Sequence, residues 1–459
     1  MSESKIHSVN KDLVMAKRIA ELVDAAGGRS FYVGGYVRDK ILGKENKDID
    51  IEIHGITPEK LCEILDFVGK RTEMGASFGI YGLRGCDLDI AMPRMEEATG
   101  RGHRDFAVFV DPFLGTEKAA RRRDFTINAM MEDVLTGEIV DHFGGVEDLK
   151  NGILRHVNAE TFVEDPLRVL RGAQFAARFG FVLAEETIAL CRTMDLTALA
   201  SERILGELEK ALLKADKPSI FFEEMRKMEQ LDDWFPEVKA LIGVPQEPAF
   251  HPEGDVWNHT MLVLDQAAKW REEASNPMGF MLAALTHDFG KVTTTEVIDG
   301  RLRSFGHDVE GVPIAKAFLQ RITNEVKLNK YVLNLVEHHM KPHAKAMQKS
   351  GIKSTNKMFD QSVDPAGLIL LARADHLGRP GFETDPKIED FLWERLAIFE
   401  EMMARPFVMG ADLVAAGLKP GPEFSEILAF AHKLRLAGVE KENALKQTLA
   451  YAGTMNQGV

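Results

Sequence analysis

The sequence predicts an α+β protein, with a small mixed-sheet head at the N-terminus followed by a long all-α body. Three observations support this fold class. Four short segments within the first 150 residues have the apolar or alternating pattern of β-strands, whereas apolar residues recur at helical spacing from about residue 164 onward. Residues 243–254 are rich in proline and glycine, which indicates a boundary inside the helical part.

The individual elements follow from local patterns. Residues 12–25 carry apolar positions at helical spacing, and this helix should end at Gly27 and Gly28. Strands are predicted over 31–34, 48–53, 78–83 and 86–91, and amphipathic helices over 201–213 and 218–231. A histidine-bearing helical block runs from about 255 to 400, and two more helices follow a glycine- and proline-rich turn at 417–422.

Composition limits the class of protein. A chain of 459 residues is long enough for two to four domains, and a hydrophobic content of 45% is ordinary for a soluble globular protein. No apolar run approaches the ~18 residues of a membrane span, and the N-terminus lacks the apolar core of a signal peptide, so we expect a cytoplasmic protein with no membrane partner. Cys62, Cys86 and Cys191 are odd in number and widely spaced, which argues against a disulfide framework or a zinc site.

The charge distribution leaves room for nucleic acid. A net charge of −14 argues against a surface that binds polyanions everywhere. Local basic patches can still supply the attraction, and residues 101–124 contain six arginines and lysines against four acids.

Residues 48–53, Asp-Ile-Asp-Ile-Glu-Ile, are the most informative stretch. Side chains alternate along a strand, so Asp48, Asp50 and Glu52 share one face, and three isoleucines share the other. Acids this close repel one another, and a divalent cation relieves the repulsion. Asp89, flanked by apolar residues of a later strand, is a candidate third acid. An isolated Asp-x-Asp is more often a solvated strand face, but the neighbouring motifs favour a metal site.

A glycine pair lies just upstream. Gly34 and Gly35 follow an apolar run, and glycines in such a turn let backbone N–H groups approach a phosphate closely. The alternative is an ordinary turn. A phosphate-binding turn beside paired carboxylates indicates nucleotide chemistry, because phosphoryl transfer needs metal ions held on rigid strands.

Residues 122–129 read Arg-Arg-Asp-Phe-Thr-Ile-Asn-Ala. Arg122 and Arg123 can engage a triphosphate, and Asp124 can accept a hydrogen bond from a ribose hydroxyl. Taken alone, the stretch also fits the basic start of a helix with a buried apolar face.

Residues 164–171 should begin a helix at Pro166. Asp165 and Arg168 carry planar hydrogen-bonding groups suited to the edge of a nucleotide base, and Arg171 falls on about the same face as Arg168. A capped helix with a stripe of arginines explains this pattern equally well.

In this order, the motifs resemble those of class II CCA-adding enzymes, which are bacterial tRNA nucleotidyltransferases related to bacterial poly(A) polymerases. The matching stretches are Gly34-Gly-x-Val-Arg-Asp39, Asp48-x-Asp50, Arg122-Arg-Asp-Phe-Thr-Ile-Asn-Ala129 and Glu164-Asp-x-x-Arg168. Residues 201–207 resemble the neck motif of the same family. Residues 92–120 occupy the position of its flexible loop, which helps the pocket switch from C to A.

The resemblance implies a role for each matched residue. Asp48 and Asp50 correspond to the catalytic Mg²⁺ ligands, with Asp89 as third acid, and Asp165 and Arg168 to the amino-acid template that selects CTP or ATP. The implied nucleotide-binding residues are Gly34, Gly35, Arg38, Arg122, Arg123, Asp124, Asn128, Asp165, Arg168 and Arg171.

The helical block carries a further set of histidines and acids. Neutral imidazoles and carboxylates on helices are suitable ligands for a divalent transition metal. The order of these histidines and acids along the chain resembles that of HD-family metal-dependent phosphohydrolases. This resemblance implies a site, holding a transition metal or Mg²⁺, made of His259, His287, Asp288 and Asp375, with His307 and His339 as further candidates. His338 competes with His339, and a degenerate HD fold kept for packing or RNA binding is the alternative.

Together the resemblances imply four parts: a catalytic nucleotidyltransferase head over 1–150, a helical neck for nucleotide selection and RNA binding over 151–245, an HD-type metal domain over 246–400 and a helical tail over 401–459. The leading hypothesis is addition of CCA to the 3′ end of tRNA from CTP and ATP. An A-adding enzyme or a poly(A) polymerase is the alternative within the same chemistry. An enzyme acting chiefly as an HD phosphohydrolase is the alternative from another class.

Overall fold

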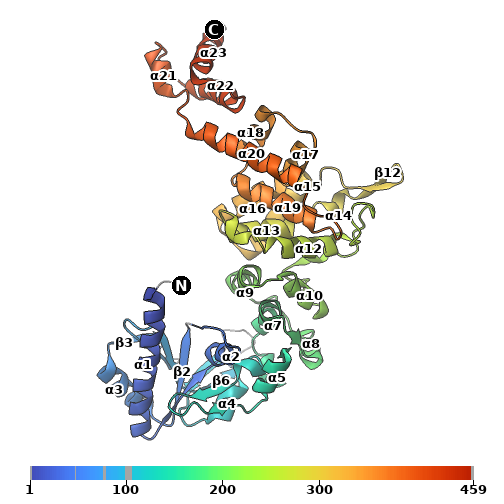
Figure 1. The fold of residues 1–459 in the computed structure, drawn as a ribbon. Coiled ribbons are helices and arrows are strands. Elements are labelled where there is room, and N and C mark those ends of the chain that lie inside the picture. Colours follow the sequence, from blue (N-terminus) through green and yellow to red (C-terminus); the bar gives the residue numbers. More distant parts are fainter. Residues whose placement is uncertain (1–2, 47, 76–78, 99–105, 456–459) are drawn as a thin grey trace. The chain divides into compact units, whose positions relative to one another are not determined.

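The computed structural model describes residues 3–46, 48–75, 79–98 and 106–455 (Figure 1). The chain divides into two compact units, residues 1–211 with 220–234, and residues 212–219 with 235–459. A mixed sheet in the first unit and a helical second unit confirm the predicted α+β class. In the described part of the chain, no helix combines the length and apolarity needed to cross a membrane.

The head contains a seven-stranded sheet in the order β3-β4-β5-β2-β1-β8-β9. Strands β2 and β5 are parallel, whereas the other neighbours are antiparallel. The strands of this sheet are β1 (Arg29–Val33), β2 (Ile49–His54), β3 (Arg71–Gly75), β4 (Ile80–Leu83), β5 (Leu88–Ala91), β8 (Met131–Asp133) and β9 (Ile139–Val140). The predicted strands are present, but each starts or ends a few residues from its predicted bounds.

Alternation of side chains gives β2 one buried face and one acidic face. Ile49, Ile51 and Ile53 are at most 1% exposed, and they pack in the core while the acids take the other face. Helix α1 lies against β1, β2 and α3. Its predicted end at the glycine pair is confirmed, since it stops at Ala25.

The first unit continues with small strand pairs and short helices. Two further pairs are β6 (Arg94–Ala98) with β7 (Phe106–Val110), and β10 (Ile153–Leu154) with β11 (Val182–Leu183). The predicted flexible loop at 92–120 is partly outside the described residues. The helices that begin in this unit are α1 (Glu3–Ala25), α2 (Gly35–Ile41), α3 (Pro58–Val68), α4 (Thr116–Arg121), η2 (Thr126–Asn128), α5 (Gly145–Asn151), α6 (Ala159–Phe162), α7 (Leu167–Phe179), α8 (Glu185–Cys191) and α9 (Ser201–Lys214).

In its described residues, the second unit is helical apart from one hairpin, β12 (Glu296–Ile298) with β13 (Arg301–Arg303). The predicted helical body is therefore confirmed, with this short hairpin as an element that was not predicted. Asp299 and Gly300 have φ of 51° and 75°, and an Asp-Gly pair with positive φ closes a tight hairpin.

The helices of the second unit build separate cores. One core includes Phe359, Leu368 and Leu396, and another includes Leu413, Ile427 and Ala444. The helices that follow α9 along the chain are α10 (Ser219–Lys227), α11 (Pro236–Lys239), α12 (Val256–Ala267), η3 (Arg271–Glu273), α13 (Pro277–Thr286), α14 (Lys291–Thr294), α15 (His307–Ile322), α16 (Val326–His338), α17 (Lys341–Met347), α18 (Ile352–Gln361), α19 (Pro365–Leu377), α20 (Pro386–Ala404), α21 (Gly410–Ala415), α22 (Phe424–Leu436) and α23 (Lys441–Met455).

Candidate functional site

Three carboxylates meet on one side of the head sheet. Strand β5 runs parallel to β2, with Asp89 in register with Asp50. Asp48 lies immediately before β2 rather than within it, so the observed strand starts one residue later than the predicted one. The structure thus brings together the three acids predicted from separate stretches of sequence.

The electrostatics of these acids fit a divalent cation. Burial, reinforced by the charge of Asp89, raises the pKa of Asp50 to about 6 in spite of the nearby Arg123. Burial and the charges of Asp87 and Asp48 likewise raise the pKa of Asp89. A divalent cation would relieve this repulsion, because hard cations prefer carboxylate oxygens.

The raised pKa of Asp50 predicts a pH-dependent stability. The folded state holds the proton more tightly than the unfolded chain, so stability is lost as pH rises from about 4 through about 6. The shift corresponds to on the order of 2–3 kcal/mol. In metal-free buffer, Asp50→Asn should therefore unfold at a higher temperature than the parent at pH 7 and at nearly the same temperature at pH 4. Thermal unfolding at both pH values checks this, and a pH-independent gap contradicts it.

The backbone at Gly34 lies close to the side chains of Arg123 and Asp50, which leaves little room for a side chain. Gly34 has φ of 67°, and a Cβ atom there would lie 3.1 Å from Arg123 Nη1 and 3.9 Å from Asp50 Oδ2. The following Gly35 begins α2. Glycine at position 34 therefore lets the chain turn while Arg123 stays beside the carboxylates.

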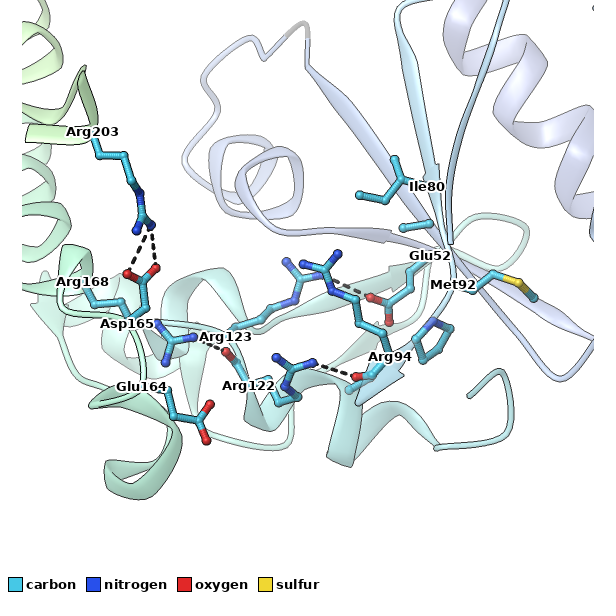
Figure 2. Close-up of a pocket in the computed structure, with 13 residues that line it drawn as sticks. Glu52, Ile80, Met92, Arg94, Arg122, Arg123, Glu164, Asp165, Arg168 and Arg203 are labelled. Carbon is cyan, nitrogen blue, oxygen red and sulfur yellow. Dashed lines mark hydrogen bonds and ion pairs between the residues drawn. The ribbon is translucent and has the colours of Figure 1, made fainter. Parts of the chain in front are cut away.

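Two adjoining cavities open beside the acids, with volumes of about 430 and 410 Å³. The second contains Gly34, Gly35 and Asp50, whereas the first extends towards Glu52, Ile80 and Met92. The residues common to both linings are Arg122, Arg123, Asp165, Arg168 and Arg203. Figure 2 shows these arginines arranged around the first cavity. Such a concentration of guanidinium groups suits a polyphosphate.

Glu52 positions one of these arginines. The Glu52 side chain is buried, and its Oε2 lies 3.5 Å from Arg123 Nη2 (Figure 2). Its Oε1 lies 2.8 Å from His54 Nε2. Burial alone would raise the pKa of Glu52, but His54 and Arg123 lower it. Glu52 thus shares the acidic face of β2 but is paired with Arg123 and contacts His54.

Asp124 lies in a buried network at the wall of the second cavity. Its Oδ2 accepts a hydrogen bond from Arg171 Nε at 2.7 Å, and its Oδ1 accepts from Asn128 Nδ2 at 3.0 Å. Arg38 donates to Asn128 Oδ1 and packs over Phe179. Arg38 and Arg171 line the cavity, and they also hold Asn128 and Asp124 in place.

The predicted base-reading pair flanks both cavities at the start of α7. Asp165 Oδ2 accepts from Arg203 Nη2 at 2.9 Å, and Arg168 Nη2 donates to the Arg122 carbonyl at 2.7 Å (Figure 2). Arg203 was not predicted individually, although it lies inside the neck motif at 201–207. Its contact with Asp165 joins that motif to the cavity wall.

A second cluster lies in the other unit. His259 on α12, His287 and Asp288 after α13, and Asp375 on α19 come together. His259 Nε2 lies 3.0 Å from Asp375 Oδ1 and 3.7 Å from Asp288 Oδ2, and His287 Nε2 lies 3.2 Å from Asp288 Oδ2. The four core residues predicted for an HD site are therefore neighbours.

Asp288 belongs to two triads that could hold a cation. One contains His259 and His287, and the other contains His307 and His339. His339 is thus the histidine that joins the cluster, whereas His338 Nδ1 contacts Lys341 Nζ.

Hydrogen bonds orient the imidazoles. The Nδ1 atoms of His287, His307 and His339 lie 2.7–2.8 Å from the carbonyls of Ala284, Ser304 and Val336, where each donates. A neutral imidazole whose Nδ1 donates carries its lone pair on Nε2, and the Nε2 atoms of His307 and His339 face each other at 3.2 Å. Two acceptors this close fit a cation between or beside them.

Burial and charge support the same conclusion. Burial, with the charge of His287, lowers the pKa of His339 to about 4, which keeps its imidazole neutral. Burial alone would raise the pKa of Asp288, but His287 and Lys291 hold it well below its usual range. Within the described residues, the buried His287 Nε2 makes no hydrogen bond. These groups fit a bound divalent metal.

Residues outside the predicted ligand set also contact the cluster, and they were not predicted from the sequence. Glu253 Oε1 accepts from His259 Nδ1 and His251 Nδ1, both at 2.8 Å. Lys291 Nζ lies 2.7 Å from Asp288 Oδ2. Glu253 sits in the proline- and glycine-rich stretch, where no local pattern marked it.

Comparison with known proteins supports these assignments at the level of the family. Residues 30–155 match the poly A polymerase head domain, residues 256–379 match the HD domain, and residues 180–242 match the probable RNA and SrmB-binding site of polymerase A. The multifunctional CCA protein of Laribacter hongkongensis is 36% identical over 423 residues, which cover 90% of this chain and 98% of that protein. That of Stenotrophomonas maltophilia is 36% identical over 89% of this chain and 98% of its own.

Solved structures share the fold. A Thermotoga maritima CCA-adding enzyme complexed with tRNA has a TM-score of 0.63 at 22% identity, covering 97% of this chain and 98% of its own. A CCA-adding enzyme complexed with ATP has a TM-score of 0.66 at 22% identity, covering 96% of each chain. The motif resemblance is thereby confirmed, and the chain belongs to the multifunctional CCA protein family, with a nucleotidyltransferase head and an HD domain.

Proposed function

We propose that this protein adds C, C and A to the 3′ end of tRNA, with CTP and ATP as donors and pyrophosphate as the leaving group. The observation that carries the proposal is the juxtaposition of Asp50 and Asp89 with an arginine-lined pair of cavities. Carboxylates that hold metal beside guanidinium groups that bind phosphates are the requirements of nucleotidyl transfer.

Each side of the site has its own task. Asp48, Asp50 and Asp89 would hold Mg²⁺, which, when bound, neutralises charge on the attacking and leaving oxygens. Arg122 and Arg123 bind the triphosphate. The 3′ hydroxyl of the RNA attacks the α-phosphorus, the bond to the β-phosphate oxygen breaks, and the hydroxyl proton leaves to solvent or a carboxylate.

Supporting residues hold these groups in place. Glu52 keeps Arg123 beside Gly34, and Arg171 keeps the buried Asp124 carboxylate fixed. A fixed Asp124 can accept from the ribose without rearranging, which lowers the entropy cost of positioning the nucleotide. We assign residues 1–150 to catalysis, 151–245 to nucleotide selection and RNA binding, 246–400 to the HD domain and 401–459 to the tail. A tRNA substrate is consistent with a cytoplasmic protein.

The decisive experiment offers tRNA transcripts ending at the discriminator, at C or at CC, with CTP, ATP or both. Full CCA addition predicts stepwise products of one, two and three added nucleotides, with A incorporated only after CC. Addition of A alone to the CC transcript would identify an A-adding enzyme. Long A tails on any RNA would identify a poly(A) polymerase.

Asp165→Ala should blur the choice between CTP and ATP. The variant removes the carboxylate that faces both cavities, and hydrogen-bonding groups in a site can discriminate by large factors. We expect the ratio of kcat/KM for correct over incorrect nucleotide to fall about tenfold or more. Glu160→Ala, at an exposed position on α6, should leave the ratio unchanged. If the ratio is unchanged in Asp165→Ala, the carboxylate has no role in nucleotide selection and serves only as a structural partner of Arg203.

A second activity is favoured by the histidine cluster. We propose that the HD domain hydrolyses phosphate esters of RNA ends or nucleotides, with His259, His287, Asp288 and Asp375 holding a transition metal or Mg²⁺ and His307 and His339 completing the site. When bound, the metal activates water as a nucleophile. Asp288, Asp375 and two histidines of the cluster, His307 and His339, line a cavity of about 440 Å³. Lys291, Arg303 and Arg379 are also in its wall, and these cations suit a phosphate.

A further inference from the structure

A row of lysines follows the HD cluster along the chain. Lysine recurs at every fourth position in Lys341, Lys345, Lys349, Lys353 and Lys357, and no acid occurs between residues 338 and 359. We call these five residues the lysine row. In a chain with a net charge of −14, a run of five lysines without an intervening acid is a local reversal of charge.

The fold gathers the lysine row on the outside of two packed helices. Helix α17 carries the first two lysines, α18 carries the last two, and the helices pack against each other and against α20 (Figure 1). Their apolar residues, among them Ala346, Met358 and Phe359, are buried in the core beneath. Burial lowers the pKa of Lys341; the charges of Glu337 and Asp308 oppose that change, and the nearby Lys345 and Lys357 add to it.

No ion pair within the described residues neutralises the row, although Glu337 and Asp308 lie near Lys341. Lys349, Lys353 and Lys357 are exposed, and none of the five forms an ion pair in the part of the chain that the structure describes. Some lysines elsewhere are paired, as in Lys210 with Glu207 and Lys441 with Asp412. Like charges held together raise the local potential, which an external anion would lower.

The spacing and surroundings of the five lysines indicate which kind of anion they bind. A membrane surface requires an amphipathic helix with a continuous exposed apolar face, whereas α17 and α18 expose only Met347 and Ile352 of their large apolar residues and bury Ala346, Met358 and Phe359. An extended polyanion fits better. Lysines four residues apart rise about 6 Å along a helix, which is comparable to one or two nucleotide steps of about 3.4 Å per strand.

We propose that the lysine row binds the phosphate backbone of the RNA substrate, a proposal that rests on the proposed function for the identity of that RNA. Helix α17 also contributes His343 and Ala344 to the wall of the HD cavity, so the RNA held by the row lies beside that cavity. Since ammonium groups contact phosphates without reading bases, the contribution is independent of sequence and sensitive to salt.

The test uses the full-length protein and a tRNA transcript that lacks CCA. The variant replaces Lys349, Lys353 and Lys357 by glutamine, and the control replaces the exposed Lys269, Lys316 and Lys327 in the same unit. Fluorescence anisotropy at several salt concentrations gives the affinity and its salt slope. We expect the row variant to bind roughly tenfold or more weakly at low salt and to lose about two to three units of slope, while the control stays within about threefold.

Enzyme assays separate this proposal from the proposed function. In the row variant, the KM for tRNA should rise while kcat for nucleotide addition stays at the parent value, because the substituted lysines lie outside the catalytic head. A row variant with the affinity and salt slope of the control overturns the proposal and leaves an acidic protein as the partner. If the parent extends no tRNA, the proposed function fails. If the parent extends tRNA and the row variant has the same KM and affinity for tRNA as the parent, only the proposal about the lysine row is refuted.

Discussion

Asp50→Asn should abolish nucleotide addition, with kcat falling by about three orders of magnitude or more. The substitution keeps the size of the side chain and removes the charge of the residue in register with Asp89. Without that charge, the remaining carboxylates hold a divalent cation weakly, and the transition state loses its main electrostatic support. Incorporation of labelled CTP into a tRNA transcript, at saturating nucleotide, measures the effect.

Controls distinguish a catalytic loss from a folding defect. Asp24→Asn is the same chemical change at an exposed position on α1, and it should retain parental activity. Asp50→Asn should also bind tRNA as the parent does, because phosphate-binding groups elsewhere are untouched. Retention of more than about a tenth of parental kcat would remove Asp50 from the metal-binding set.

Asp288→Asn should empty the HD cluster and leave nucleotide addition intact. Asp288 is the one residue shared by both histidine triads, so its loss weakens either mode of metal binding. Loss of a supporting contact already costs 10–100-fold in metal affinity, and loss of a shared ligand should cost at least about 100-fold. Metal content after dialysis and calorimetric titration with Mn²⁺, Ni²⁺ or Mg²⁺ measure the change without relying on catalysis.

The paired measurement is hydrolysis of nucleoside phosphates and phosphate-terminated RNA. Asp288→Asn should lose this activity to background, while Asp50→Asn should keep it. Asp308→Asn, in the first turn of α15 beside His307, is the matched control and should retain bound metal. Equal metal content in Asp288→Asn and the parent would show that the cluster serves packing alone.

Much of the head was predictable because its information is local. Alternating acids and isoleucines over 48–53 predicted a strand with one acidic face, and the strand is present as β2. The order of four motifs identified the family, because four motifs in one order are far more specific than any one of them alone. The β12–β13 hairpin was missed although its Asp-Gly turn is a local feature, because the surrounding pattern is helical.

Other features depend on which strands and helices become neighbours. The sequence places Asp89 39 positions after Asp50, and only the parallel pairing of β2 with β5 sets them side by side. The partner of Asp165 is Arg203, 38 positions later on another helix, and the contact depends on how α7 meets α9. Glu253 similarly reaches His259 from a loop without any periodic pattern.

The sequence by itself determined the fold class, the family and the residue types that carry the chemistry, because periodicity and motif order are properties of neighbouring residues. The tertiary structure decided which of those residues meet. It paired Glu52 with Arg123 rather than leaving it with the acids, and it selected His339 over His338 for the cluster. Such choices depend on distances of a few ångströms between elements far apart in the chain, over which charge and hydrogen bonding act.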